Sequence, residues 1–211
     1  MNSGIKQLCL IVCVLAAGCA TPKDYTKFNA ASPRSLLIVP VVNRSVSVTA
    51  PDYFLSTITI PLAEQGYYVF PVNMVKSLLE NDGLSDANLV HAAPTQKLCE
   101  LFGSDAVLYI TINKWEACYA VFTTQVKVEL YYVIKDGKTG DVLWEQQQAM
   151  TYEPQNANTG NLLGNLIAAA VTAAATKAAP NYVPLAQQAN SKAFKYPGPG
   201  IPPGPYMKTS Y

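Results

Sequence analysis

Residues 36–42 read Leu-Leu-Ile-Val-Pro-Val-Val, a short apolar run that is rich in β-branched side chains. A run of this kind is typical of a strand buried on both faces, and Pro40 within it indicates a bulge or an edge position nearby. Helix and strand signals then alternate. The pattern predicts helices over residues 51–66, 74–80 and 94–103 and strands over residues 67–72 and 106–115. This order favours parallel strands joined by right-handed crossovers.

The segment from residue 120 to residue 134 differs, because apolar and polar residues alternate along it. The positions on its apolar face are Val126, Val128, Leu130, Tyr132 and Ile134. Such alternation predicts a half-exposed strand. Residues 136–141 contain two glycines and predict a hairpin loop, after which residues 142–150 return antiparallel. We therefore expect an α/β fold with a mixed sheet flanked by helices, parallel in its N-terminal part and an antiparallel meander in its C-terminal part.

The N-terminus has the organisation of an export signal. Lys6 precedes an apolar run over residues 8–17, which is too short to span a bilayer and is followed by Gly18 and Cys19. Residues 15–19 resemble a bacterial lipobox, although Ala16 stands where leucine is commoner. We expect residues 1–18 to be removed and Cys19 to carry a diacylglycerol and an N-linked acyl chain such as palmitate. The alternative is an ordinary signal peptide, with Cys19 incidental.

The remaining chain is expected to form one domain. We predict an acylated cysteine and flexible tether over residues 19–34, a single α/β domain over 35–195 that ends in a helix over 182–195, and a Pro/Gly-rich disordered tail over 196–211. The tail could instead be a polyproline ligand for a partner.

An alanine-rich segment, residues 159–178, predicts a helix with small residues on one side at steps of four, among them Gly160, Gly164 and Ala168. A stripe of this kind allows close helix packing. Packing on the sheet or on a second subunit is favoured over insertion into a bilayer, because Asn165 and threonines interrupt the apolar character.

The chain offers few groups for catalysis or for binding a cofactor. His91 is the only histidine, and no Cys-x-x-Cys, phosphate-binding loop or dinucleotide motif occurs. We expect no enzyme activity, no metal and no cofactor beyond the acyl chains. Removal of Lys6 with the signal leaves 14 basic and 14 acidic residues, so no nucleic-acid partner is expected. Cys99 and Cys118 could form a disulfide, or could be two buried thiols.

Five stretches carry a resemblance to a known family. They are residues 39–40, 43–44, 51–57, 61–72 and 105–112. Together they resemble a family of proteobacterial outer-membrane lipoproteins of unassigned function that includes a neisserial vaccine-candidate antigen, and the proline-rich tail lies outside the likeness. The resemblance implies a single domain similar to the N-terminal domain of TolB. More distantly it implies likeness to the curli secretion lipoprotein and to the lipoproteins that activate peptidoglycan synthases.

In Gram-negative lipoproteins an Asp after the acylated cysteine tends to retain the protein at the inner membrane. Ala20 at that position therefore implies sorting to the outer membrane, with the periplasmic side favoured over the cell surface.

Two hypotheses for function remain open at this point. In the first, the protein acts by protein–protein contact in an envelope secretion or assembly complex, as a homodimer or with other lipoproteins. Contact candidates for it are Tyr119, Phe122, Tyr131 and the helix over 159–178. In the second, it binds peptidoglycan, lipid or a small ligand in a pocket. The aromatic residues proposed to line that pocket are Tyr67, Tyr68, Tyr109 and Trp115.

Overall fold

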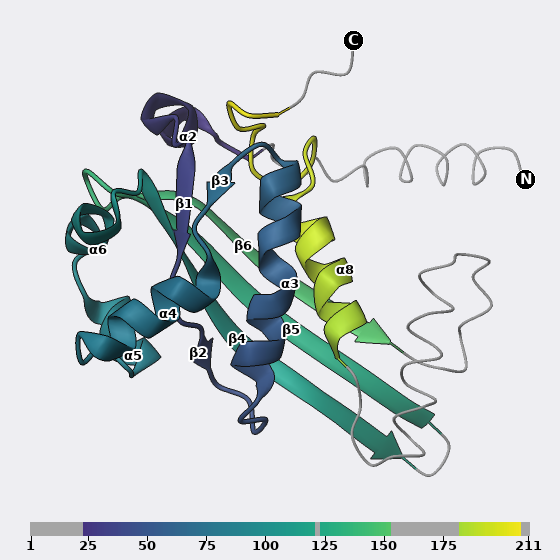
Figure 1. The fold of residues 1–211 in the computed structure, drawn as a ribbon. Helices are drawn as coiled ribbons and strands as arrows, with labels where there is room; N and C mark the ends of the chain where they lie inside the picture. Colours follow the sequence, from purple (N-terminus) through teal and green to yellow (C-terminus); the bar gives the residue numbers. More distant parts are fainter. Residues whose placement is uncertain (1–22, 121–122, 153–181, 208–211) are drawn as a thin grey trace, which may run out of the picture.

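The computed structural model describes residues 23–120, 123–152 and 182–207 (Figure 1). A six-stranded sheet has the strand order β3-β1-β4-β5-β6, with β2 also paired to β4. The strands are β1 (Ser35–Ile38), β2 (Val42–Asn43), β3 (Tyr68–Val69), β4 (Ala106–Ala120), β5 (Thr123–Asp136) and β6 (Val142–Tyr152). The helices are α2 (Thr26–Ala31), α3 (Ala50–Glu64), α4 (Val72–Asn81), α5 (Ala87–Ala92), α6 (Thr95–Phe102) and α8 (Val183–Phe194).

The apolar run over residues 36–42 forms the centre of the parallel half. β1 pairs in parallel with both β3 and β4. The run divides at Pro40, since proline cannot donate to the strand ladder, and β2 then continues the parallel pairing with β4. Leu36 and Ile38 are buried on one face of the sheet, and Leu37 and Val39 on the other. The prediction of a strand buried on both faces is confirmed.

The antiparallel meander is also confirmed. β4 pairs antiparallel with β5, and β5 pairs antiparallel with β6. The alternating positions predicted to be apolar in β5 are all buried: Val126, Val128, Leu130, Tyr132 and Ile134. The β4–β5 register shifts between Ile112 and Lys114, so Asn113 is the extra residue of a bulge.

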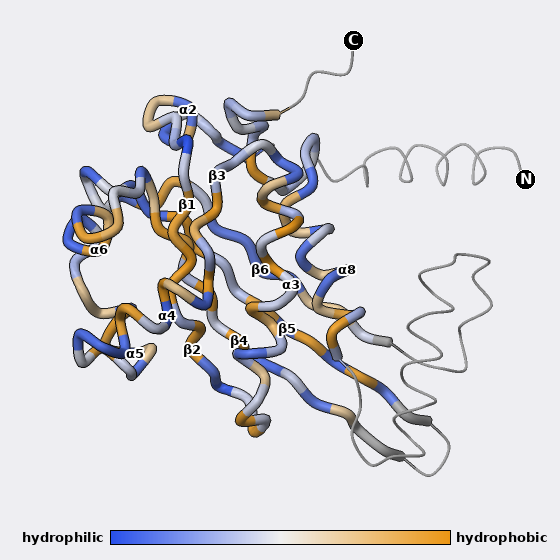
Figure 2. Tube along the Cα trace, viewed as in Figure 1, coloured by the Kyte–Doolittle hydropathy of each residue, from blue (hydrophilic) through white to orange (hydrophobic). Residues whose placement is uncertain are grey.

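Helices cover the sheet unequally on its two faces. α3 and α8 pack on the larger cluster, which includes the inward side chains of β5, whereas α4, α5 and α6 pack on a smaller cluster beside β1 and β4. Figure 2 shows hydrophobic residues concentrated along β1 and the parts of the neighbouring segments that face it. Among the described residues, no helix has both the length and the apolar character needed to cross a membrane.

Buried hydrogen bonds fasten α8 to the core. The Tyr132 hydroxyl donates to Asn190 Oδ1 at 2.5 Å, and Asn190 Nδ2 donates to Thr57 Oγ1 at 2.8 Å. Thr57 in turn donates to the carbonyl of Phe54 at 2.6 Å. The chain of bonds connects β5, α8 and α3, and it satisfies polar groups that would be costly to leave unpaired in an apolar interior.

The structure contradicts the prediction that both ends of the domain are flexible. Residues 26–31, inside the expected tether, form α2, whose Phe28 is buried against the main core. Residues 196–207, inside the expected disordered tail, follow a fixed path over the domain and bury Ile201 completely. We call residues 196–207 the C-terminal strap. Prolines and glycines exclude a helix here, but they do not prevent packing as an extended segment.

Smaller differences lie between the strands. The strand expected over residues 67–72 is only Tyr68–Val69, because Pro71 caps the start of α4. Helix α5 was not predicted; the Asp86 side chain caps it by accepting a hydrogen bond from the backbone N–H of Asn88. Pro61 lies within α3 without ending it.

Candidate functional site

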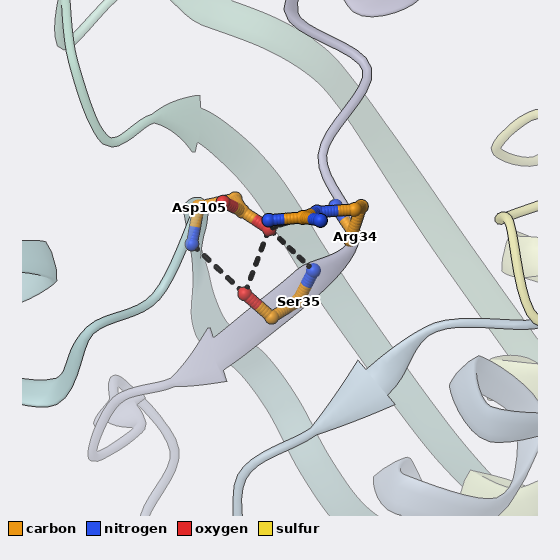
Figure 3. Close-up of polar contacts among 3 residues, drawn as sticks. All are labelled: Arg34, Ser35 and Asp105. Atoms are coloured by element: carbon orange, nitrogen blue, oxygen red, sulfur yellow. Dashed lines mark hydrogen bonds and ion pairs between the residues drawn. The ribbon is translucent and has the colours of Figure 1, made fainter.

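The polar cluster nearest to a catalytic arrangement joins Arg34, Ser35 and Asp105 (Figure 3). Asp105 Oδ2 accepts hydrogen bonds from the backbone N–H groups of Arg34 and Ser35 and from the Ser35 hydroxyl, each at 3.0 Å. The Ser35 hydroxyl accepts one from the Asp105 N–H at 2.9 Å. These reciprocal bonds fasten the start of β1 to the start of β4. Ser35 and Asp105 are both engaged in these bonds between the two strands, which is a structural role.

His91 lies beyond the opposite end of β1. Its Nε2–H donates to the carbonyl of Pro40 at 2.9 Å, and its ring packs edge-on against Tyr109 at 5.1 Å between centroids. Burial lowers the pKa of His91, with the positive charge of Lys135 acting in the same direction and the bond to Pro40 opposing both. The ring therefore fills the break between β1 and β2 as a neutral group.

Metal-binding groups do not converge in the described part of the chain. Among residues 23–120, 123–152 and 182–207, no three His, Cys, Asp or Glu side chains come together as a metal site would need.

Cys99 is a free, buried thiol, so the disulfide proposed with Cys118 is not formed in this structure. Its sulfur accepts a hydrogen bond from the Ser104 hydroxyl at 3.2 Å, and burial raises its pKa. The backbone of Cys118 lies near the far end of β4, on the order of 40 Å along the strand from Ala106 at ~3.3 Å per residue. Disulfide-bonded residues have Cα atoms about 4.4–6.8 Å apart. For Cys99, the alternative of a buried thiol is the one that the structure supports.

The aromatic residues proposed to line a pocket do not meet. Tyr67 and Trp115 belong to the cluster under α3 and α8, Tyr109 belongs to the cluster on the opposite face, and Tyr68 is exposed. A half-open cavity of about 360 Å³ does exist between α2 and the β5–β6 turn. Its polar lining carries both signs of charge, from Lys27, Asp136, Lys138 and Asp141, and it contains no aromatic side chain.

The outward side of the meander is an exposed polar surface. We call it the open sheet face, and its residues are Thr111, Lys114, Glu116, Lys127, Glu129, Tyr131, Glu145 and Gln147. All of them are half-buried or exposed. In the strand register Lys114 lies opposite Glu129, and Glu116 lies opposite Lys127, so unlike charges face each other across β4 and β5. Cross-strand pairs of unlike charge stabilise a sheet by roughly 0.2–1 kcal/mol each.

Hydrogen bonds hold the side chains of the open sheet face in place. Lys114 Nζ lies 3.3 Å from Glu129 Oε2, and Gln147 Nε2 donates to Glu129 Oε1 at 2.9 Å. The Tyr131 hydroxyl donates to Glu145 Oε2, and this bond is the main reason why the pKa of Tyr131 is raised. Tyr131, the contact candidate identified from sequence, thus occupies the centre of a rigid polar surface.

Strand β6 forms one edge of the sheet, and side chains protect it. Lys23 donates to the carbonyl of Glu145, Gln146 Nε2 donates to the carbonyl of Gln147 at 2.9 Å, and Gln148 Nε2 donates to the carbonyl of Ala149 at 3.1 Å. Such contacts oppose the addition of another strand at an exposed edge. Sequence reasoning missed this role. The run of three glutamines over residues 146–148 is the signal that could have indicated it.

Several predicted site residues lie outside what the structure describes. Cys19 precedes the described residues, and the small-residue stripe of Gly160, Gly164 and Ala168 falls in residues 153–181. Phe122 is not described, and the side chain of Tyr119 is not described. Their predicted roles stay predictions.

Comparison with known proteins first establishes the class, which is that of lipoproteins. A family model described as "Putative lipoprotein GNA1162-like" matches residues 23–206, and the chain belongs to this family. It is 36% identical over 141 residues to "Putative lipoprotein NMB1124/NMB1162" of Neisseria meningitidis serogroup B, and the match spans 67% of this chain and 65% of that protein.

The fold agrees with that of a solved lipoprotein structure. The crystal structure of lipoprotein GNA1162 from Neisseria meningitidis aligns at 35% identity with a TM-score of 0.58, covering 68% of this chain and 99% of that chain. A PelC dodecamer from Paraburkholderia phytofirmans aligns at 13% identity with a TM-score of 0.48, covering 82% of this chain and 91% of that chain. A similarity as low as this second one supports no conclusion about function.

The family match confirms the resemblance identified from sequence, but it also corrects one part of it. The proline-rich segment was expected to lie outside the likeness, whereas the match extends to residue 206 and so includes nearly all of the C-terminal strap.

Proposed function

We propose that this lipoprotein is anchored in the outer membrane through Cys19 and acts by protein–protein contact, as a component of an envelope secretion or assembly complex. The partner is a second copy of the chain or another envelope lipoprotein. The observation that carries the proposal is the open sheet face, an exposed surface on which Tyr131 bonds to Glu145 and lies near the pair of Lys114 and Glu129.

The chemistry of that face suits a contact surface better than a small-molecule site. Five of its eight side chains are already held by hydrogen bonds or an ion pair, so a partner would not have to order them, and side-chain ordering costs roughly 0.5–1.5 kcal/mol per residue at interfaces. Tyrosine is among the residues enriched at binding hot spots. The β6 edge is protected by Lys23 and two glutamines, which favours contact through the face over addition of a strand.

The alternative, a periplasmic module that binds peptidoglycan, lipid or a small ligand, has less support. It was based on an aromatic pocket, and the four residues proposed for it lie on different faces of the domain. The cavity between α2 and the β5–β6 turn lacks the aromatic lining that such sites usually have, and a second cavity of about 210 Å³, between α2 and the C-terminal strap, contains only Tyr67 of the four.

The anchor rests on the sequence around Cys19 together with membership of a lipoprotein family. Each buried methylene contributes ~0.8 kcal/mol, so two or more acyl chains hold a protein stably at a bilayer where one chain is marginal. A domain held in this way searches for partners in two dimensions. Contact with another membrane-held protein is the function that this arrangement serves best.

Site-specific photocrosslinking in cells tests the proposal. Benzoylphenylalanine replaces Tyr131 on the open sheet face or, as a matched control, Tyr53, an exposed tyrosine at the start of α3. We expect a discrete protein adduct from position 131 and none from position 53, and we expect Glu129→Lys to abolish the adduct. The absence of a protein adduct at position 131, or equal adducts at both positions, would contradict contact through this face.

The second hypothesis has its own test. Purified protein is incubated with isolated peptidoglycan and sedimented. Retention on peptidoglycan, combined with no protein adduct at position 131, would favour a binding module over a contact protein.

A further inference from the structure

The segment that follows the anchor is bound tightly to the C-terminal strap at one end of the domain (Figure 1). Lys23 Nζ donates to the carbonyl of Pro199 at 3.2 Å. The Tyr25 hydroxyl lies 2.9 Å from the carbonyl oxygen of Gly198 and 2.5 Å from that of Gly200, and the Tyr25 ring packs edge-on against Tyr196 at 6.1 Å. The first described residues and the last ones therefore form one structural unit.

The C-terminal strap is itself held firmly against the domain. Trp144 Nε1 donates to the carbonyl of Pro199 at 2.9 Å, and the Gly204 N–H donates to the carbonyl of Gln65 at 2.7 Å. A Cβ at Gly204 would lie 2.3 Å from the carbonyl oxygen of Gly66, so the backbone approach requires glycine. Ile201 is completely buried. The surface that this segment presents is therefore fixed relative to the sheet.

The chain between Cys19 and this unit is short. Four residue steps separate Cys19 from Lys23. At no more than ~3.6 Å per residue, they reach at most about 14 Å. The polar headgroup layer of one leaflet is roughly 5–7 Å thick, taken from total and hydrocarbon thicknesses of about 40–45 and 30 Å. An acylated Cys19 would thus keep the end of the domain that carries Lys23 next to the headgroups, with little freedom to turn over.

The side chains exposed at this end suit a bilayer surface. Tyr196 is 42% exposed, Tyr206 is 60% exposed and Met207 is 43% exposed. Tyrosine has an apolar ring with a polar tip and is enriched where a membrane meets water. Lys195, directly before Tyr196 in the chain, and Lys27 in α2 are also exposed, and a long lysine side chain can keep its ammonium in the headgroup layer.

The opposite end of the domain lies far from the C-terminal strap. β4 runs away from the end that carries the C-terminal strap and α2 towards the far side of the molecule, and β5 returns antiparallel beside it (Figure 1). The loop that follows β2 also lies at that side, because β2 pairs with residues 111–112 of β4 whereas β1 pairs with residues 106–108. Val46 in this loop is 92% exposed.

We propose that the C-terminal strap, through Tyr196, Tyr206 and Met207, rests on the surface of the bilayer that holds the acyl chains, so that β4 and β5 project away from the membrane. This inference rests on the proposed anchor at Cys19. It assigns the strap a role beyond closing the fold, since the strap sets the orientation in which the open sheet face is presented to partners.

Photocrosslinking to lipid tests the orientation. Full-length protein is expressed in cells grown with a clickable fatty acid, with benzoylphenylalanine at position 196, 206 or 46, and the membrane-bound protein is irradiated. Two probes are placed on the strap, so the test does not depend on one substitution being tolerated. The intact mass of each variant reports the acylation of Cys19. Cys99→Ser is a control variant, because Cys99 is buried and its replacement leaves the exposed surface unchanged.

We expect phospholipid adducts at positions 196 and 206 to exceed those at position 46 several-fold in acylated protein. Equal lipid adducts at all three positions would overturn the inference, as would adducts to a protein in place of lipid at positions 196 and 206, and in both cases the anchor itself would stand. Absence of the acyl mass would instead remove the anchor, and the inference would fall with it.

Discussion

Replacing Ile201 by alanine tests whether the C-terminal strap belongs to the folded core. The side chain is 0% exposed and packs in the main cluster, although its neighbours in sequence are proline and glycine. Ile201→Ala removes three carbon groups at roughly 0.8 kcal/mol each, or about 2.4 kcal/mol in lost burial alone. A residual cavity adds to this, and buried isoleucine-to-alanine changes cost about 2–5 kcal/mol in general. We therefore expect a loss of at least about 2 kcal/mol in the free energy of unfolding.

The assay is urea unfolding of the domain without its signal, followed by tryptophan fluorescence, because Trp144 donates to Pro199 within the strap. Ile60→Ala is the matched control, since Ile60 is 61% exposed on α3. Surface changes of this kind stay within about 0.5 kcal/mol. For a domain of this size, the predicted loss for Ile201→Ala corresponds to a fall in Tm of about 2–4 °C per kcal/mol. Equal stabilities of the two variants would refute the packing of the strap.

Three further predictions follow from buried groups. Asn190→Ala should lower the free energy of unfolding by about 1–3 kcal/mol, because it leaves the buried Tyr132 hydroxyl without its acceptor, whereas Thr57 keeps its bond to the carbonyl of Phe54; a urea midpoint within error of wild type would count against the buried bond chain. Cys99 should resist a thiol reagent in the native protein and react only on unfolding, since burial raises its pKa; peptide mapping of the labelled site measures this, and fast native labelling would contradict the burial. Burial lowers the folded-state pKa of His91, so the folded state binds fewer protons than the unfolded state near pH 6. The free energy of unfolding should therefore fall as pH drops from about 7 through 6.5 towards the folded pKa. In urea titrations His91→Gln should flatten this slope, and an unchanged slope would contradict the assignment.

Much of the sheet could be predicted from sequence because its signals are local. The apolar run over residues 36–42 and the alternation over residues 120–134 each indicate a strand and its buried side chains, without any knowledge of the strands that pair with it. The glycines of residues 136–141 specify the turn between β5 and β6. Helix α6, expected over 94–103, begins after Pro94 and ends at Gly103, where a positive φ of 70° suits glycine.

The strap and α2 could not be predicted because tertiary contacts decide them. Residues 196–205 carry the composition of a disordered segment, and their order depends on hydrogen-bond donors that are distant in sequence, such as Tyr25, Tyr67 and Trp144. Likewise α2 has only six residues, too few to be stable by itself, and it depends on burying Phe28. Composition reports the cost of ordering a segment, and it does not report the contacts that compensate for that cost.

The candidate site was predicted in part. Tyr131 could be identified as outward-facing from the alternation alone, but its bond to Glu145 and the charge pairs around it depend on the register of three strands. The aromatic pocket was wrong because the residues of a strand point to both faces of the sheet, and Tyr109 and Trp115 of β4 lie in clusters on opposite faces.

The central claim is that Cys19 anchors the domain at a membrane, and intact mass with membrane fractionation of wild type beside Cys19→Ser tests it most directly. We predict that the wild type carries the mass of the diacylglycerol and N-linked acyl chain and sediments with the outer membrane, while Cys19→Ser lacks this mass and is absent from the outer membrane. Wild type and variant that are both unmodified and both soluble would contradict the account.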